Sequence, residues 1–112
     1  MHGKYKSYFV IPTEASRVLK DYGWEFHSTK RIPRELVDSI LLSLRMEKIS
    51  VESDMERFSG KDADATVFFD KTGEVEQIYL RAYRERDVGK ELQELLVGNL
   101  SGLEIFNPRT VI

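Results

Sequence analysis

The chain of 112 residues has the length of a single domain, contains no cysteine and carries a formal net charge of −2. The missing cysteines exclude disulfides, thiolate catalysis and cysteine zinc sites, and the weak negative charge makes nucleic acid an unfavoured partner. No apolar run reaches the roughly 18 residues that a membrane span requires, so we expect a cytoplasmic protein that forms one domain over residues 1–112.

The first two elements are predicted from short patterns. Aromatic and apolar residues predict a strand over residues 5–11. The segment 12–23 predicts a helix, because Thr13 can cap it, Glu14 places a negative charge in its first turn and Gly23 can end it.

A short strand and the clearest helix of the chain follow. Residues 24–28 alternate, with Trp24 and Phe26 on one face of the predicted strand. Residues 33–48 predict a central helix, because Pro33 suits the first helical position and an apolar stripe runs along one face. The stripe consists of Leu36, Val37, Ile40, Leu41 and Leu44.

A row of acidic residues is predicted on the next strand. Polar and apolar residues alternate strictly over residues 49–58, which indicates one half-buried strand. Its polar positions then project from one face, about 6.6 Å apart along the strand. They are Ser50, Glu52, Asp54 and Glu56. Like charges on one face repel, so a fold answers them with cations or presents them to a partner.

The second half of the chain predicts two strong strands over residues 65–69 and 75–83, a helix over 88–98 and a short strand over 103–106. Three consecutive strands joined by short loops are typical of an antiparallel meander. We therefore expect an α+β domain with a largely antiparallel sheet of about five to six strands and three helices packed mainly on one face.

The tetrapeptide Asp-Lys-Thr-Gly, residues 70–73, resembles the phosphorylation site of the ion-pumping P-type ATPases. In that family the next residue is typically Thr and a helix follows, whereas here Glu74 and a strand follow, without the family's second acidic motif downstream. We therefore interpret the tetrapeptide as a hairpin turn in which Gly73 takes the left-handed conformation. On this interpretation Gly73→Val destabilises the fold, while Asp70→Asn has little effect.

No residue pattern predicts a catalytic group, a metal ion or a cofactor. Asp62 and Asp64 lack EF-hand spacing, because the sixth and twelfth positions counted from Asp62 are Val67 and Gly73. His27 has no accompanying nucleophile motif such as G-x-S-x-G. The sequence therefore favours a protein without catalysis, and an enzyme stays open as an alternative.

The first functional hypothesis is a non-enzymatic protein-binding domain, such as a bacterial toxin-immunity or inhibitor protein. Its acidic sheet face would mask a basic partner, for example a toxin or a nuclease, because opposite charges steer and select partners. The predicted partner-binding residues are Glu52, Asp54, Glu56, Asp62 and Asp64.

Two alternatives stay open. A small phosphate- or nucleotide-binding domain or enzyme would use two clusters of basic residues, one at the start of the central helix and one around Tyr83. We expect the cluster around Tyr83 to pair instead with acidic residues of a neighbouring strand. A homodimer would form through an open sheet edge, for which residues 111–112 are a candidate. The basic ligand-binding residues are Lys30, Arg31, Arg34, Arg81, Arg84 and Arg86.

Overall fold

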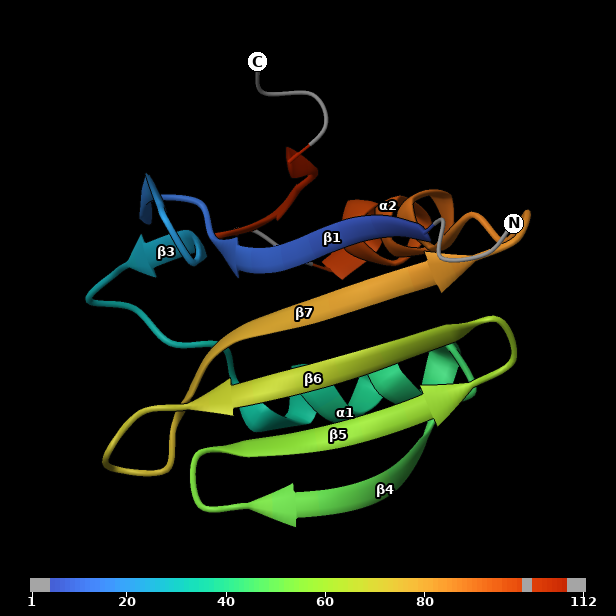
Figure 1. Cartoon of the computed structure of the whole chain (residues 1–112), viewed down its shortest axis with the longest axis horizontal. Helices are drawn as coiled ribbons and strands as arrows, with labels where there is room; N and C mark the ends of the chain where they lie inside the picture. The colour runs from blue at the N-terminus through green and yellow to red at the C-terminus, as the bar shows by residue number, and fades with distance from the viewer. Residues whose placement is uncertain (1–4, 100–101, 109–112) are drawn as a thin grey trace.

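The computed structural model describes residues 5–99 and 102–108, which form a six-stranded antiparallel sheet, a separate two-stranded sheet and two helices (Figure 1). The strands of the large sheet are β1 (Tyr5–Pro12), β4 (Glu47–Glu52), β5 (Met55–Gly60), β6 (Ala63–Phe69), β7 (Val75–Tyr83) and β8 (Leu103–Phe106). The small sheet pairs β2 (Ser16–Lys20) with β3 (Gly23–His27), and the helices are α1 (Arg34–Ser43) and α2 (Val88–Asn99). The order along the large sheet is β4-β5-β6-β7-β1-β8, so β1 lies between β7 and β8.

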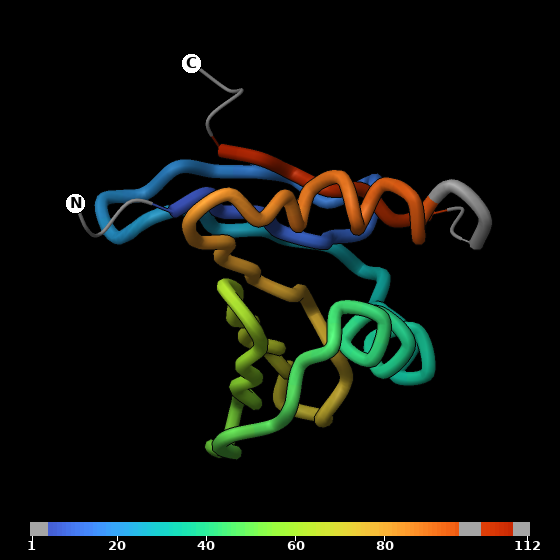
Figure 2. Tube along the Cα trace, turned by 90° about the vertical axis from the view of Figure 1, so that its right-hand side faces the viewer, coloured from blue at the N-terminus to red at the C-terminus, as the bar shows by residue number. Residues whose placement is uncertain are grey.

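The two helices share one hydrophobic core against one face of the large sheet. Val37 and Ile40 of α1 are buried in the same cluster as Leu92 of α2 and as Ile78 and Leu80 of β7. Figure 2 shows α1 beside the meander β4–β7 and α2 beside the part of the sheet that contains β1. Burial on this scale, rather than helix propensity, holds such short helices in place.

The central helix is confirmed but is shorter than predicted. Four residues of the predicted stripe are buried, namely Val37, Ile40, Leu41 and Leu44, and Leu36 packs at the edge of the core. The helix ends at Ser43 because Arg45 takes a left-handed φ of 59°, which turns the chain directly into β4.

The helix predicted over residues 12–23 is wrong, because this segment forms β2 and the start of β3. The positions Ala15, Val18, Leu19 and Tyr22 have helical spacing, so the sequence pattern alone suits a helix. Pairing of β2 with β3 overrides it and leaves Val18, Leu19 and Tyr22 exposed by 40%, 64% and 77%. The described chain therefore has two helices instead of the three expected.

The single strand predicted over residues 49–58 is also wrong, because the segment is the β4–β5 hairpin with a turn at Ser53–Asp54. A two-residue turn preserves strict alternation in the sequence, so the pattern does not reveal it. In the hairpin Glu52 pairs with Met55 on one face, whereas Glu56 shares the opposite face with the buried Phe58. The predicted acidic row is therefore split between two faces and a turn.

The other predicted elements of the sheet are confirmed. Strands expected over residues 5–11, 24–28, 65–69, 75–83 and 103–106 correspond to β1, β3, β6, β7 and β8, and the helix expected over 88–98 is α2. The α+β class is confirmed as well. The candidate edge at residues 111–112 lies outside the described residues.

Among the described residues, the β2–β3 hairpin covers one end of the sheet face opposite the helices. The β2–β3 hairpin packs Trp24 and Phe26 against Phe106 of β8, with ring centroids 4.9 and 5.6 Å apart. Figure 2 shows the tip of this hairpin on the side of the sheet opposite α1. The outward residues of β5, β6 and β7 remain open to solvent. Within the described chain, neither helix is long and apolar enough to cross a membrane.

Candidate binding site on the open face of the sheet

The Asp70 turn between β6 and β7 holds the hairpin together. One Asp70 carboxylate oxygen accepts hydrogen bonds from the Thr72 hydroxyl (2.6 Å) and from the backbone N–H groups of Thr72 (2.8 Å) and Glu74 (3.0 Å). The other oxygen accepts from the Arg31 guanidinium at 2.8 Å. The Thr72 hydroxyl and then Arg31 lower the pKa of Asp70 well below its usual range. With Gly73 at a φ of 88°, the interpretation as a hairpin turn is confirmed.

The acidic residues predicted to bind a partner are mostly paired within the fold. Four of the five form ion pairs, which are Glu52–Arg57, Glu56–Arg34, Asp62–Arg84 and Asp64–Arg81. Asp54 lies in the β4–β5 turn and forms no ion pair with any described residue. The structure therefore does not gather these carboxylates into one free acidic surface.

Most of the basic residues predicted to bind a ligand are also paired with acidic residues of the fold. Arg31 binds Asp70, Arg34 binds Glu56 and Arg86 binds both carboxylate oxygens of Glu91. The expected internal pairing of Arg81, Arg84 and Arg86 is confirmed, but their partners are Asp64, Asp62 and Glu91 rather than the acids of β4 and β5. Lys30 forms no ion pair within the described chain.

A groove of about 360 Å³ lies between the β2–β3 hairpin and the open face of the sheet. Five aromatic side chains line it, namely Phe9, Tyr22, Trp24, Phe68 and Tyr79. The other lining residues are Ser7, Gly23, Gln77 and Pro108. None of these nine residues is charged, so the groove is neutral and largely aromatic.

Strand register brings the aromatic residues together. Phe9 of β1 and Tyr79 of β7 are cross-strand neighbours with ring centroids 4.8 Å apart. Phe68 of β6 and Gln77 of β7 are neighbours in the adjoining row. Trp24 comes from β3, which the aromatic cluster at the β8 end fixes on the sheet. Most of the groove wall therefore belongs to packed strands, while Tyr22 and Pro108 line it from outside the strands.

The groove contains several polar groups that can orient a ligand. The Gln77 side chain has no hydrogen-bond partner among the described residues. The hydroxyls of Ser7 and Tyr79 are 3.1 Å apart and share one hydrogen bond, which leaves further donor and acceptor capacity. Tyr22 is 77% exposed at the hairpin tip, and its hydroxyl donates to Glu25 at 2.9 Å. A neutral ligand can thus find both stacking surfaces and hydrogen bonds here.

The open face beyond the groove is also close to neutral. The Arg81 guanidinium lies over the rings of Tyr5 and Tyr83, at 5.4 and 5.9 Å from their centroids. It pairs with Asp64, which also accepts a hydrogen bond from the Tyr83 hydroxyl at 2.6 Å. Burial and this hydrogen bond raise the pKa of Tyr83 to about 12. The phenol therefore stays neutral at physiological pH, and Arg81 is balanced by Asp64.

Sequence reasoning missed this site because its residues come from five separate segments. Each of Phe9, Phe68 and Tyr79 is half-buried on a strand face that the sequence alone assigns to no particular side. The helix predicted over residues 12–23 also removed the hairpin that forms the second wall. The available signal was the presence of aromatic residues on several strands, but the sequence does not say which of them share a face.

The described residues contain no group of three or more His, Asp or Glu side chains arranged to hold a metal ion. Comparison of the chain with protein-family models, with curated proteins and with solved structures found no match. The function proposed below therefore depends on the geometry of the groove alone.

Proposed function

We propose that this chain is a non-enzymatic domain that binds a partner protein, and that it holds an extended, proline-rich segment of that partner in the aromatic groove. The observation that carries the proposal is the gathering of five aromatic side chains in one uncharged groove on the open sheet face. Grooves lined by aromatic rings favour polyproline II segments, which lose little conformational entropy when they bind.

The polar groups of the groove support this choice of ligand. A polyproline II segment has no internal hydrogen bonds, so its carbonyl groups need donors from outside. Gln77 and the Ser7–Tyr79 hydroxyl pair can supply such donors beside the rings of Phe9 and Trp24. Pro108 of the chain itself forms part of the groove wall.

Charge argues against nucleic acid as the ligand of this groove. Affinity for nucleic acid comes largely from Lys and Arg that neutralise phosphates. The groove has no charged lining residue, and the nearby Arg81 is paired with Asp64. A basic toxin or nuclease, the partner class expected from the acidic row, would have to compete with the ion pairs of Glu52, Glu56, Asp62 and Asp64.

Trp24 makes the proposal directly measurable, because it is the one tryptophan of the sequence and it lines the groove. We expect short proline-rich peptides to shift its fluorescence emission in a saturable manner. Tyr22→Ala and Gln77→Ala are expected to weaken binding by about tenfold, since each removes a groove contact worth on the order of 1–2 kcal/mol.

Leu19→Ala is the matched control. Leu19 is 64% exposed on the same hairpin but does not line the groove. An equal loss in Leu19→Ala, or the absence of any saturable change with proline-rich peptides, contradicts the proposal. A fluorescence change produced only by a single-stranded oligonucleotide also contradicts it and assigns the groove to bases instead.

A further inference from the structure

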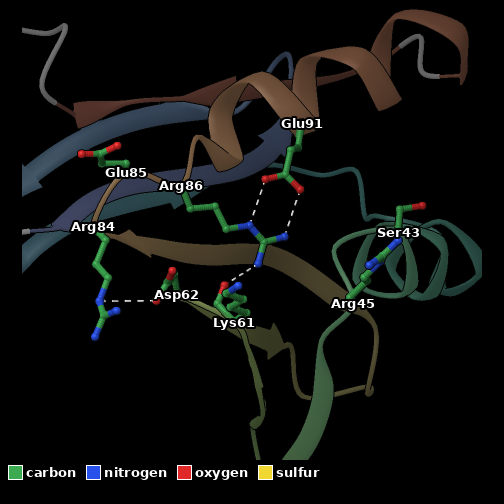
Figure 3. Close-up of a pocket in the computed structure, with 8 residues that line it drawn as sticks. All are labelled: Ser43, Arg45, Lys61, Asp62, Arg84, Glu85, Arg86 and Glu91. Carbon is green, nitrogen blue, oxygen red and sulfur yellow. Dashed lines mark hydrogen bonds and ion pairs between the residues drawn. The ribbon is translucent and has the colours of Figure 1, made fainter.

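A second cavity, of about 840 Å³, lies at the end of the molecule where three chain connections meet. The connections are the α1–β4 turn, the β5–β6 turn and the β7–α2 loop. Figure 3 shows eight side chains around this cavity, seven of which carry a formal charge. The cavity is therefore lined by charged side chains, in contrast to the uncharged aromatic groove, and shares no lining residue with it.

Arg86 is a structural part of this cavity and not a free cation. Its guanidinium donates to both carboxylate oxygens of Glu91 at 2.9 Å, to the Lys61 carbonyl at 2.6 Å and to the Leu44 carbonyl at 2.9 Å. These bonds tie the three connections to one another. Both carboxylate oxygens of Glu91 are engaged by Arg86, so Glu91 pairs with no other cation of the cavity among the described residues. The hydrogen bond from Arg86 lowers the pKa of Glu91.

Two cations of the cavity remain without a counter-charge. Within the described chain, the side chains of Arg45 and Lys61 form no hydrogen bond and no ion pair. Arg84 is 81% exposed and reaches only Asp62, at 3.6 Å. In Figure 3 the remaining acid, Glu85, points away from the side of the cavity where Arg45 lies.

The backbone brings the two free cations into one neighbourhood. Gly60 precedes Lys61, and a Cβ placed on Gly60 would lie 2.9 Å from the Arg45 carbonyl oxygen. The turn that carries Arg45 and the turn that carries Lys61 are thus in direct contact, and only glycine permits this approach. Two unpaired cations that line one cavity make it attractive to an anion.

The turns around the cavity also hold unfavourable backbone conformations. Arg45, Asp62 and Arg84 have φ of 59°, 55° and 58°, and they are the only residues other than glycine with positive φ in the described chain. All three line this cavity. Such conformations cost free energy and gather where a structure positions side chains for binding. The positive charge of Arg45 also suits the carboxyl end of α1. That role does not account for the second cation, Lys61, in the same cavity.

We propose that this cavity binds the phosphate group of a small phosphorylated molecule between Arg45 and Lys61, with Arg84 as an outer contact. Two cations from different turns match the charge of a phosphate, and the guanidinium of Arg45 can donate two parallel hydrogen bonds to its oxygens. The volume leaves room for the organic part of a small metabolite.

Isothermal titration of the full chain with sodium pyrophosphate, at constant ionic strength, tests the site. We expect saturable binding that Arg45→Gly and Lys61→Ala each weaken by at least about tenfold, because each removes a charge-assisted contact. Glycine tolerates the left-handed conformation at position 45, so Arg45→Gly removes the charge without adding strain. Circular dichroism of each variant confirms that it is folded.

Lys71→Ala is the matched control, because Lys71 is an exposed cation in the distant β6–β7 turn. It removes the same charge and is expected to leave the affinity for pyrophosphate unchanged. The proposal is overturned by three outcomes: no saturable binding of pyrophosphate or of inorganic phosphate, equal weakening by Lys71→Ala, or binding of a single-stranded oligonucleotide without binding of pyrophosphate.

Discussion

Arg31 Nε donates a hydrogen bond to Asp70 Oδ2 at 2.8 Å, and this contact joins the segment before α1 to the turn between β6 and β7. The next residue, Ile32, forms a bridge with Val75, in which its N–H donates to the Val75 carbonyl at 3.0 Å. Together the two contacts fix where α1 enters the helix layer relative to the meander. The Asp70 carboxylate is thus a connector between two parts of the fold.

These hydrogen bonds change what we expect of Asp70→Asn. The sequence alone predicts little effect, but the neutral amide loses the ion pair with Arg31 and weakens the bonds to Thr72. We therefore predict a clearly lower midpoint of urea unfolding for Asp70→Asn at neutral pH. Lys71→Ala, which removes an exposed side chain of the same turn, is the control and should unfold close to the parent midpoint.

The contribution of Asp70 is expected to depend on pH. Its pKa in the folded chain lies below the usual value of 3.8, so the fold favours the ionised carboxylate. The stabilisation is therefore complete above about pH 5 and is lost as pH falls through 3.8 toward the folded pKa. Urea unfolding at a series of pH values should show the difference between the parent chain and Asp70→Asn shrinking below about pH 4. A difference that grows on acidification contradicts this assignment.

Gly73 is predicted to be required for its backbone conformation and not for space. Its φ is 88°, and a Cβ placed on it would meet no atom within 4 Å. Gly73→Val should therefore cost about 1–2 kcal/mol through backbone strain alone. Gly73→Asn should cost less, because Asn tolerates left-handed conformations. Equal destabilisation by Val and Asn, measured by chemical denaturation, would point to a steric cause instead.

Neighbouring leucines of α1 offer a matched test of the core. Leu41 is 3% exposed, whereas Leu42 is 78% exposed. Leu41→Ala should lower the free energy of unfolding by about 2–5 kcal/mol, since it leaves a cavity beneath the sheet. Leu42→Ala should change it by less than about 0.5 kcal/mol. Similar costs for the two variants would mean that another molecule or another part of the chain covers Leu42.

Arg86→Lys is predicted to destabilise the fold although it keeps the charge. Arg86 reaches Glu91, the Lys61 carbonyl and the Leu44 carbonyl with one planar guanidinium, and a single ammonium cannot reproduce this arrangement. The loss should be about 1–3 kcal/mol in thermal or chemical unfolding. Arg57→Lys serves as the comparison, because Arg57 is 54% exposed and its pair with Glu52 spans 3.6 Å, so little stability depends on it.

The fold was predictable from the sequence where periodicity had a single interpretation. The stripe from Leu36 to Leu44 buries one face of α1, and the turn at Gly73 joins two strands as expected. The segment 12–23 was not predictable in this way, because helical spacing of Ala15, Val18 and Leu19 competes with strand pairing. That pairing is stabilised by contacts with β1 and β8, such as those of Phe26 with Phe9 and Phe106. Tertiary packing decided between the two.

The candidate sites were harder to predict than the fold. The acidic row failed because a two-residue turn after Glu52 leaves the alternation intact while it reverses the chain. Ion pairs such as Arg34–Glu56 connect residues that are distant in sequence, so charge counting could not foresee them. The groove and the cavity lined by charged side chains each combine turns and strands from several segments, and their existence follows from sheet order.

The position of β1 between β7 and β8 has a consequence for how the chain folds. The strands from β4 to β7 each pair with the next one along the chain, so this meander can close by local contacts soon after it is synthesised. β1 has both of its partners far downstream, and its apolar residues Val10 and Ile11 must wait for them. During synthesis β1 is thus an unpaired apolar strand that is prone to aggregation. Its pairing with β7 is the step that removes this exposed strand from the nascent chain.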